Sequence, residues 1–169
     1  MKKFGTLAFG AIAGFVLSCS TAGAADESFA SFRVLKPEVA LNAAQAAMAD
    51  CRQKGFQVAV SVTDRFGILQ VTLRDQLAGP HTTDTAFRKA WTAITFRSDT
   101  SELAKLSESG EAWALRNVEG VMPLGGGVRI IAGDGDMVGA IGVSGAPAGS
   151  EDDACAKAGI AAISADIQF

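Results

Sequence analysis

The sequence predicts an α+β fold in which helices pack on an antiparallel sheet. Two pairs of β-branched segments, 58–63 with 68–73 and 128–132 with 137–143, are each joined by a short turn that contains glycine, as in β-hairpins. Segments with helical spacing of apolar residues precede, separate and follow these pairs. Hairpins grouped in this way favour an antiparallel sheet in a single domain.

The first helix is expected to begin at Pro37 and to end at Gly55, because proline suits a first helical turn and glycine suits the C-terminal end. Small and apolar residues recur on one face of this segment: Ala40, Ala44, Ala47, Met48 and Cys51. A face rich in alanine lets the helix backbone lie close to whatever it covers. The hairpin that follows turns through residues 64–67.

Two further helices are expected in the middle of the chain. Thr82 or Thr83 can cap a helix that runs to about Arg97. Asp99, with Glu102 three residues later, resembles a capping box and predicts a short helix to about Ser109.

The last third begins with three glycines at 125–127, before the second strand pair, and two or three strands are expected here. Ser150, with Asp153 at the third helical position, predicts the cap of a final helix. The buried stripe of this helix is expected to comprise Ala156, Ile160, Ile163 and Ile167.

Residues 1–25 have the pattern of a secretory signal peptide. Two lysines precede an uncharged run at 4–17, and small residues at 22–25 suit cleavage after Ala24 or Ala25. Cys19 follows a sequence that loosely resembles a lipoprotein cleavage box, and this is the alternative. The expected product is soluble and either periplasmic or secreted, with one domain over residues 26–169.

Removal of residues 1–25 from the 169-residue chain leaves 144 residues, enough for one core. Two lysines leave with the signal, so 13 basic and 18 acidic residues give a net charge of −5. This balance argues against nucleic acid or an anionic membrane surface as a partner. No second apolar run is long enough to span a bilayer.

The mature chain keeps Cys51 and Cys155, and in an oxidising compartment such a pair favours a disulfide. The first and last helices are expected to lie near each other, which would bring the two thiols within bonding range. Two small buried thiols are the alternative. The sequence contains no C-x-x-C or C-x-x-C-H motif.

The inventory of catalytic side chains is small. His81 is the one histidine, tyrosine is absent, and no nucleophile elbow is found. The glycines at 125–127 and 133–135 do not form the dinucleotide-binding pattern, so a bend or close-packing role is the favoured interpretation.

Two stretches resemble a known family. Arg74-Asp75, followed by TTDTAFRKAWTA at 82–93, is similar to one signature of the GlcG/HbpS family. MPLGGGVRI at 122–130, VGAIGVSG at 138–145 and DDACAKAG at 152–159 resemble its other signatures, in the same order. The resemblance implies a profilin-like domain with a five-stranded antiparallel sheet, assembled into homo-oligomers. Family members include extracellular haem-binding proteins and haem-binding domains attached to cobalamin adenosyltransferases, and others occur in operons for small hydroxy acids.

Haem needs an apolar slot, cations for two propionates and, in many sites, an axial ligand. His81 is the candidate iron ligand, ahead of the methionines, and the alternative is a solvated loop histidine. Arg74, Arg88 and Lys89 are candidate propionate partners, and Phe66 is a candidate apolar contact. Met122 is a less favoured candidate for the iron ligand. The alternative is that Arg88 and Lys89 lie on the solvent-exposed face of a helix and bind no ligand.

The expected function is non-covalent capture, storage or relay of haem by an exported protein, a binding protein rather than an enzyme. One alternative is a sensor or accessory protein of a catabolic pathway that binds a small carboxylate at the start of the helix near Thr82. Another is a subunit that docks to an unidentified protein.

Overall fold

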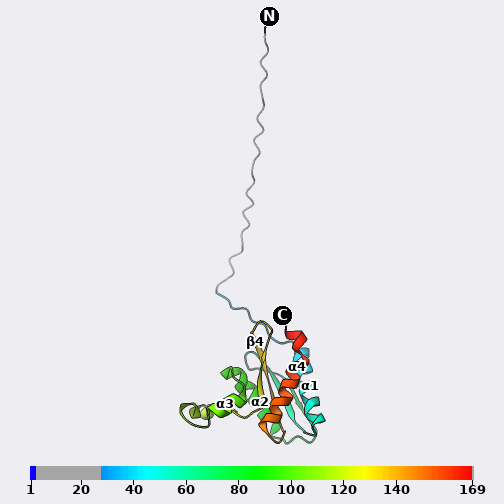
Figure 1. Cartoon of the computed structure of the whole chain (residues 1–169), viewed down its shortest axis with the longest axis vertical. Helices are drawn as coiled ribbons and strands as arrows, with labels where there is room; N and C mark the ends of the chain where they lie inside the picture. Colours follow the sequence, from blue (N-terminus) through cyan, green and yellow to red (C-terminus); the bar gives the residue numbers. More distant parts are fainter. Residues whose placement is uncertain (3–27, 169) are drawn as a thin grey trace. The chain divides into compact units, whose positions relative to one another are not determined.

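The computed structural model describes residues 1–2 and 28–168, and the chain divides into two units, Met1–Phe32 and Arg33–Phe169. The predicted signal peptide falls almost entirely outside the described residues. Figure 1 shows the second unit, which holds every helix and strand described. The elements are α1 (Pro37–Gln53), β1 (Ala59–Asp64), β2 (Leu69–Arg74), α2 (Thr82–Phe96), α3 (Thr100–Leu106), η1 (Glu111–Asn117), β3 (Gly127–Ile131), β4 (Met137–Ser144), α4 (Gly149–Ala162) and η2 (Ser164–Ile167).

The strands form an antiparallel sheet in the order β2-β1-β4-β3, so the α+β prediction and both hairpins are confirmed. The described residues give four strands, and the expected fifth is wrong for this part of the chain. Residues 118–126, which precede β3, turn instead of extending. Val121 N bonds to Val118 O, Leu124 N bonds to Met122 O, and Gly126 has a φ of +115°.

The two faces of the sheet differ in side-chain size. Val60 and Val62 of β1, with Ile141 and Val143 of β4, belong to the main core under α1 and α4. The alternate positions of β4, Ala140 and Gly142, lie against α2 on the other face. Because successive side chains of a strand point to opposite faces, the alternation of large and small residues in β4 gives one face with bulky side chains and one face on which a helix can pack closely.

Helix α2 lies close to the sheet because Gly142 has no side chain. A Cβ atom at Gly142 would lie 1.9 Å from the carbonyl oxygen of Ala86 in α2. A Cβ atom at Gly127 of β3 would lie 2.4 Å from the carbonyl oxygen of Lys89. These are backbone contacts that cannot be relieved by a rotamer change, so both glycines set the depth at which α2 packs.

Helices α1 and α4 lie side by side in Figure 1 and are joined by a disulfide between Cys51 and Cys155, which confirms the predicted pairing. Both cysteines are fully buried. Ala43 and Ala47 of α1 face Gly159 of α4, where a Cβ atom would lie 2.5 Å from the carbonyl oxygen of Ala43. Small residues therefore allow the two helix backbones to approach.

Asp99 is the N-cap residue of α3, as predicted, although its side chain makes no cap hydrogen bond, and the predicted caps of α2 and α4 are wrong. The N-cap of α2 is His81, and Thr82 Oγ1 donates a hydrogen bond to Gly79 O instead of capping. Asp99 precedes α3 but accepts hydrogen bonds from Arg129 N and Nε, because β3 lies beside it. α4 begins after Ala148, whose N–H donates to the carboxylate of Glu151.

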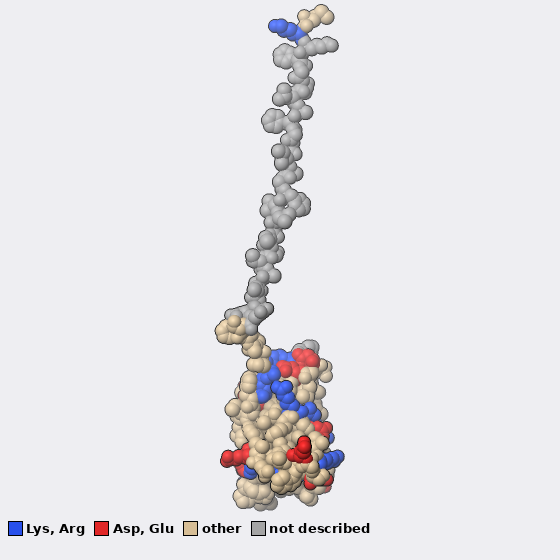
Figure 2. Space-filling view, turned by 90° about the vertical axis from the view of Figure 1, so that its left-hand side faces the viewer, with Lys and Arg blue, Asp and Glu red and all other residues tan. Residues whose placement is uncertain are grey.

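No helix among the described residues is long and apolar enough to cross a bilayer. On the face of the domain shown in Figure 2, basic and acidic side chains are interspersed, with broad uncharged areas between them.

We expect Gly142→Ala to destabilise the fold by about 3 kcal/mol, since overpacking against backbone cannot relax. Urea denaturation measures the change. Gly135→Ala is the control, because Gly135 has a φ of +89° but no atom within 4 Å of an added Cβ, and its expected cost is about 1–2 kcal/mol. Equal losses in the two variants would show that close packing of α2 is not the determinant.

Removal of the disulfide in a Cys51→Ala/Cys155→Ala variant should lower the free energy of unfolding by about 4–5 kcal/mol, the entropic estimate for a loop of about 100 residues. The bonded cysteines are 104 residues apart. Urea titrations with and without reductant provide the measurement. Reductant should shift the wild-type midpoint and leave that of the double variant unchanged; a wild-type midpoint insensitive to reductant contradicts the prediction.

Candidate functional site

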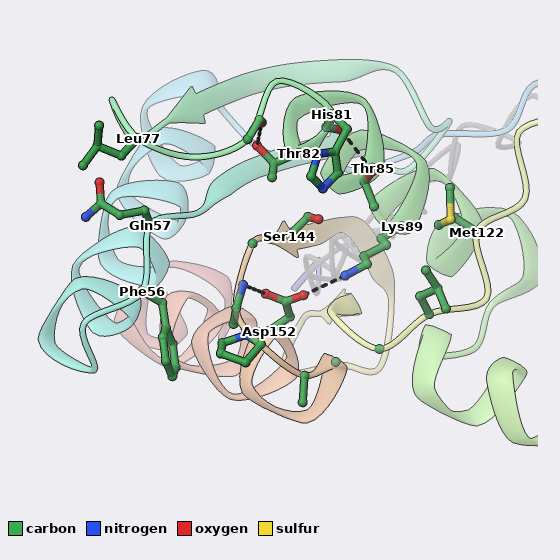
Figure 3. Close-up of a pocket in the computed structure, with 18 of the residues that line it drawn as sticks. Phe56, Gln57, Leu77, His81, Thr82, Thr85, Lys89, Met122, Ser144 and Asp152 are labelled. Carbon is green, nitrogen blue, oxygen red and sulfur yellow. Dashed lines mark hydrogen bonds and ion pairs between the residues drawn. The ribbon is translucent and has the colours of Figure 1, made fainter.

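A pocket of about 870 Å³ opens beside the start of α2. Figure 3 shows its walls, which come from the end of β4, the first turn of α4, the segment before β1 and the loop before β3. Its residues are Gly55, Phe56, Gln57, Leu77, Gly79, His81, Thr82, Thr85, Lys89, Ala104, Met122, Leu124, Gly125, Ser144, Gly145, Ala146, Pro147, Ala148, Gly149 and Asp152. The volume is in the range of about 300–1,000 Å³ that is typical of small-molecule and cofactor sites.

His81 stands on the wall of this pocket as the N-cap of α2. Its backbone carbonyl accepts hydrogen bonds from Thr85 N and from Thr85 Oγ1 at 3.0 Å, which fixes the main chain. Its ring lies over Gly79, where a Cβ atom would be 2.8 Å from the imidazole Cε1. The imidazole has no hydrogen-bond partner among the residues that the structure describes, so its nitrogens are open to a ligand.

The loop that leads to His81 is tied to its surroundings by the Arg74-Asp75 pair. The Arg74 guanidinium donates to Ala78 O, and Asp75 N donates to Val58 O. The buried Asp75 carboxylate accepts from Arg52 Nε at 2.8 Å. This carboxylate raises the pKa of Arg52 above its ordinary value. The pair therefore positions the loop and leaves Arg74 outside the pocket.

A buried ion pair forms the floor of the pocket. Lys89 Nζ lies 2.8 Å from Asp152 Oδ2, and each side chain is 4% exposed. Lys89 Nζ also donates to Val143 O at 2.9 Å, and Asp152 Oδ1 accepts from Ala146 N at 3.1 Å. Burial raises the pKa of Asp152, and the neighbouring Lys89 offsets only part of that rise.

The triple glycine passes directly beside this ion pair. A Cβ atom at Gly126 would lie 3.0 Å from Lys89 Nζ and 2.7 Å from Asp152 Cβ. Gly126 N donates to Asp153 Oδ1, and Gly127 N donates to Thr100 Oγ1. The loop is thus a close-packing device, as the sequence favoured.

The remaining walls are largely apolar. Phe56 and Leu77 lie on one side of the pocket in Figure 3, and Met122 lies on the other. Leu124 also lines the pocket. The main chain of Met122 is held by its N–H, which donates to Thr92 Oγ1 at 2.8 Å. A flat apolar ligand would therefore meet side chains from two separate parts of the sequence, 56–77 and 122–124.

Of the candidate residues, His81, Lys89 and Met122 come together at the pocket. Arg88 lies elsewhere, since its Nε donates to Gly120 O and its Nη1 is 3.6 Å from Asp84. Phe66 is 58% exposed at the β1–β2 turn, away from the pocket. Among the described residues no group of three or more His, Cys, Asp or Glu side chains is placed to hold a metal ion.

Sequence reasoning did not assign Ser144 or Asp152 to the site. Both lie inside the quoted family signatures, VGAIGVSG and DDACAKAG. The signal available in the sequence was the pair Asp152-Asp153 near the start of α4, which follows a strand that ends at Ser144. What could not be seen was that Lys89, 63 residues earlier, reaches Asp152.

The fold and the site define a small α+β domain with a part-apolar, part-polar pocket at the start of α2. The family model described as haem degrading protein HbpS-like matches residues 35–161. The chain belongs to this HbpS-like family, so the resemblance to the GlcG/HbpS family is confirmed.

Solved structures agree with this assignment. A double mutant of HbpS from Streptomyces reticuli is 39% identical, with a TM-score of 0.76 over 85% of this chain and 97% of that one. The PduOC:heme complex is 28% identical, with a TM-score of 0.70 over 78% and 96%. ORFY of Klebsiella pneumoniae shares the fold, with a TM-score of 0.79 over 84% and 99% at 23% identity.

A curated relative, the corrinoid adenosyltransferase PduO of Salmonella typhimurium, is 32% identical over 121 residues. The match covers 70% of this chain and 36% of PduO, so the chain spans about a third of the length of that relative.

Lys89→Met should destabilise the protein by about 3–5 kcal/mol, because it leaves the Asp152 carboxylate buried without its partner. Asp152→Asn should lower the free energy of unfolding by a similar amount, because it leaves the Lys89 ammonium group buried without its carboxylate partner. The double variant should lose less than the sum of the two, and denaturation of all four proteins gives the coupling energy. Strictly additive losses would contradict a direct interaction.

Proposed function

We propose that this chain binds haem non-covalently in the pocket, with His81 as an axial ligand of the iron. The observation that carries the proposal is the His81 imidazole, which has no hydrogen-bond partner among the described residues and faces a pocket with apolar walls. Family membership supports it, as does the likeness to a protein whose structure is described as a heme complex.

The residues present fit such a group. The pocket volume is sufficient for a cofactor, and Phe56, Leu77, Met122 and Leu124 supply apolar contacts. Haem bound there would supply an iron that accepts a nitrogen ligand and an absorption band that reports its ligation. Met122 is the second candidate ligand, because it lines the same pocket.

We further propose that the protein is exported to the periplasm or secreted. The signal-peptide pattern at residues 1–25 indicates export, with cleavage after Ala24 or Ala25. A disulfide between α1 and α4 supports an oxidising compartment, where such bonds persist. An exported protein of this kind would capture, store or relay haem.

A small carboxylate is the second candidate ligand. The polar part of the pocket, with Lys89, Ser144 and the first turn of α2, favours it. Arg74, which was expected beside this site, donates to Ala78 O and does not line the pocket.

Titration of the purified protein with haemin, followed by absorbance, tests the proposal. We expect a saturable Soret shift in the wild type, and a weaker and spectrally different complex in His81→Ala because the nitrogen ligand is lost. Added imidazole should restore the wild-type spectrum in that variant. Thr83→Ala is the matched control, since Thr83 is adjacent but does not line the pocket.

The outcomes separate two parts of the proposal. A Soret shift that is identical in His81→Ala would retain haem binding and exclude His81 as the ligand. Absence of any shift in the wild type would exclude haem and leave the small carboxylate as the ligand to test.

A further inference from the structure

Ser144, the last residue of β4, lines the pocket. The residue is 5% exposed, and its Oγ forms no hydrogen bond with any residue that the structure describes. Strand alternation places Ser144 on the same face of β4 as Ala140 and Gly142, which is the face that α2 covers. A hydroxyl that lines a pocket and has no protein partner can donate to a ligand or to water.

Lys89, at the floor of the pocket, has one donor left unused. An ammonium group carries three N–H donors. One bonds to Val143 O at 2.9 Å and one to Asp152 Oδ2 at 2.8 Å. The third has no acceptor among the described residues, while Lys89 lines the pocket (Figure 3).

We propose that Lys89 and Ser144 form a subsite for a single carboxylate group of the ligand. One carboxylate oxygen accepts the spare N–H of Lys89, and the other accepts the O–H of Ser144. The inference rests on the proposed function, because the subsite belongs to the same pocket. The carboxylate is either a haem propionate, directed inward, or that of a small acid.

The local charge favours a carboxylate over a phosphate. Lys89 is flanked by Asp152, which it pairs with, and by Asp153, whose carboxylate accepts from Gly126 N. A phosphate brings up to two negative charges beside these acids, whereas a carboxylate brings one.

Paired titrations with haemin and haemin dimethyl ester, in the same low concentration of detergent, test the subsite. The ester has the same ring and iron but no ionised propionate. We expect wild type to bind haemin at least about tenfold more tightly than the ester, as for a charge-assisted hydrogen bond. Ser144→Ala should lose about tenfold for haemin and bind the ester as the wild type does, and Thr83→Ala should behave as wild type.

Ser144→Ala removes no hydrogen bond within the described protein, so it should fold and melt like the wild type. Equal affinity of wild type for haemin and its ester, or an unchanged haemin affinity in Ser144→Ala, would overturn the subsite while haem binding stands. Failure of both porphyrins to bind overturns the proposed function instead. In that case the subsite stands if millimolar acetate or lactate raises the melting temperature of the wild type but not of Ser144→Ala, and is refuted if neither acid does.

Discussion

The depth at which α2 packs on the sheet is the constraint on which the site depends. Gly142 and Gly127 bring the backbone of α2 into contact with β4 and β3, at Ala86 and Lys89. Because the helix lies this low, Lys89 on its inner face is almost fully buried and is paired inside the domain. Its partners are Val143 O and the Asp152 carboxylate, where the end of β4 meets the start of α4. The same low position sets His81, at the beginning of the helix, on the wall of the pocket.

The buried ion pair between Lys89 and Asp152 is better understood as a feature that serves ligand recognition than as a source of stability. Desolvation of two charges offsets much of their attraction, and well-packed apolar residues often stabilise a core as well. The pKa of Asp152 agrees with this, because burial raises it and the neighbouring Lys89 lowers it only in part. Such a pair does, however, leave one N–H of Lys89 without an acceptor among the described residues at a pocket that Lys89 lines, which an apolar replacement could not supply. The presence of the pair is therefore easier to explain by ligand recognition than by folding.

Most of the fold could be predicted from the sequence, because each element carries its own local signal. Proline at 37 and glycine at 55 delimit α1, and β-branched segments joined by turns that contain glycine mark both hairpins. The N-cap position of α3 at Asp99 could also be predicted, but its carboxylate binds Arg129 instead of capping the helix. The cap of α2 could not be predicted, because the Thr82 hydroxyl bonds to Gly79 O in the preceding loop. Only part of the candidate site could be predicted, because hydrogen-bond partners decide which of the candidate residues line the pocket. His81 and Met122 were candidates by residue type. The exclusion of Arg88 depends on Gly120 O, which lies 32 residues away in the sequence, and that of Arg74 on the conformation of the loop that presents Ala78 O to it.

The mixed character of the pocket connects the two candidate ligands. Phe56, Leu77 and Leu124 offer contacts that a small hydrophilic acid would leave largely unused, whereas a porphyrin ring would cover them. The polar floor, in contrast, suits a carboxylate of either origin. A ligand that fills both the apolar wall and the polar floor must be broad and apolar and must carry an acidic group at one edge. Haem has all of these properties, whereas a two- or three-carbon acid has only the acidic group. The division of the pocket into an apolar wall and a buried polar floor is therefore the structural reason to place haem first.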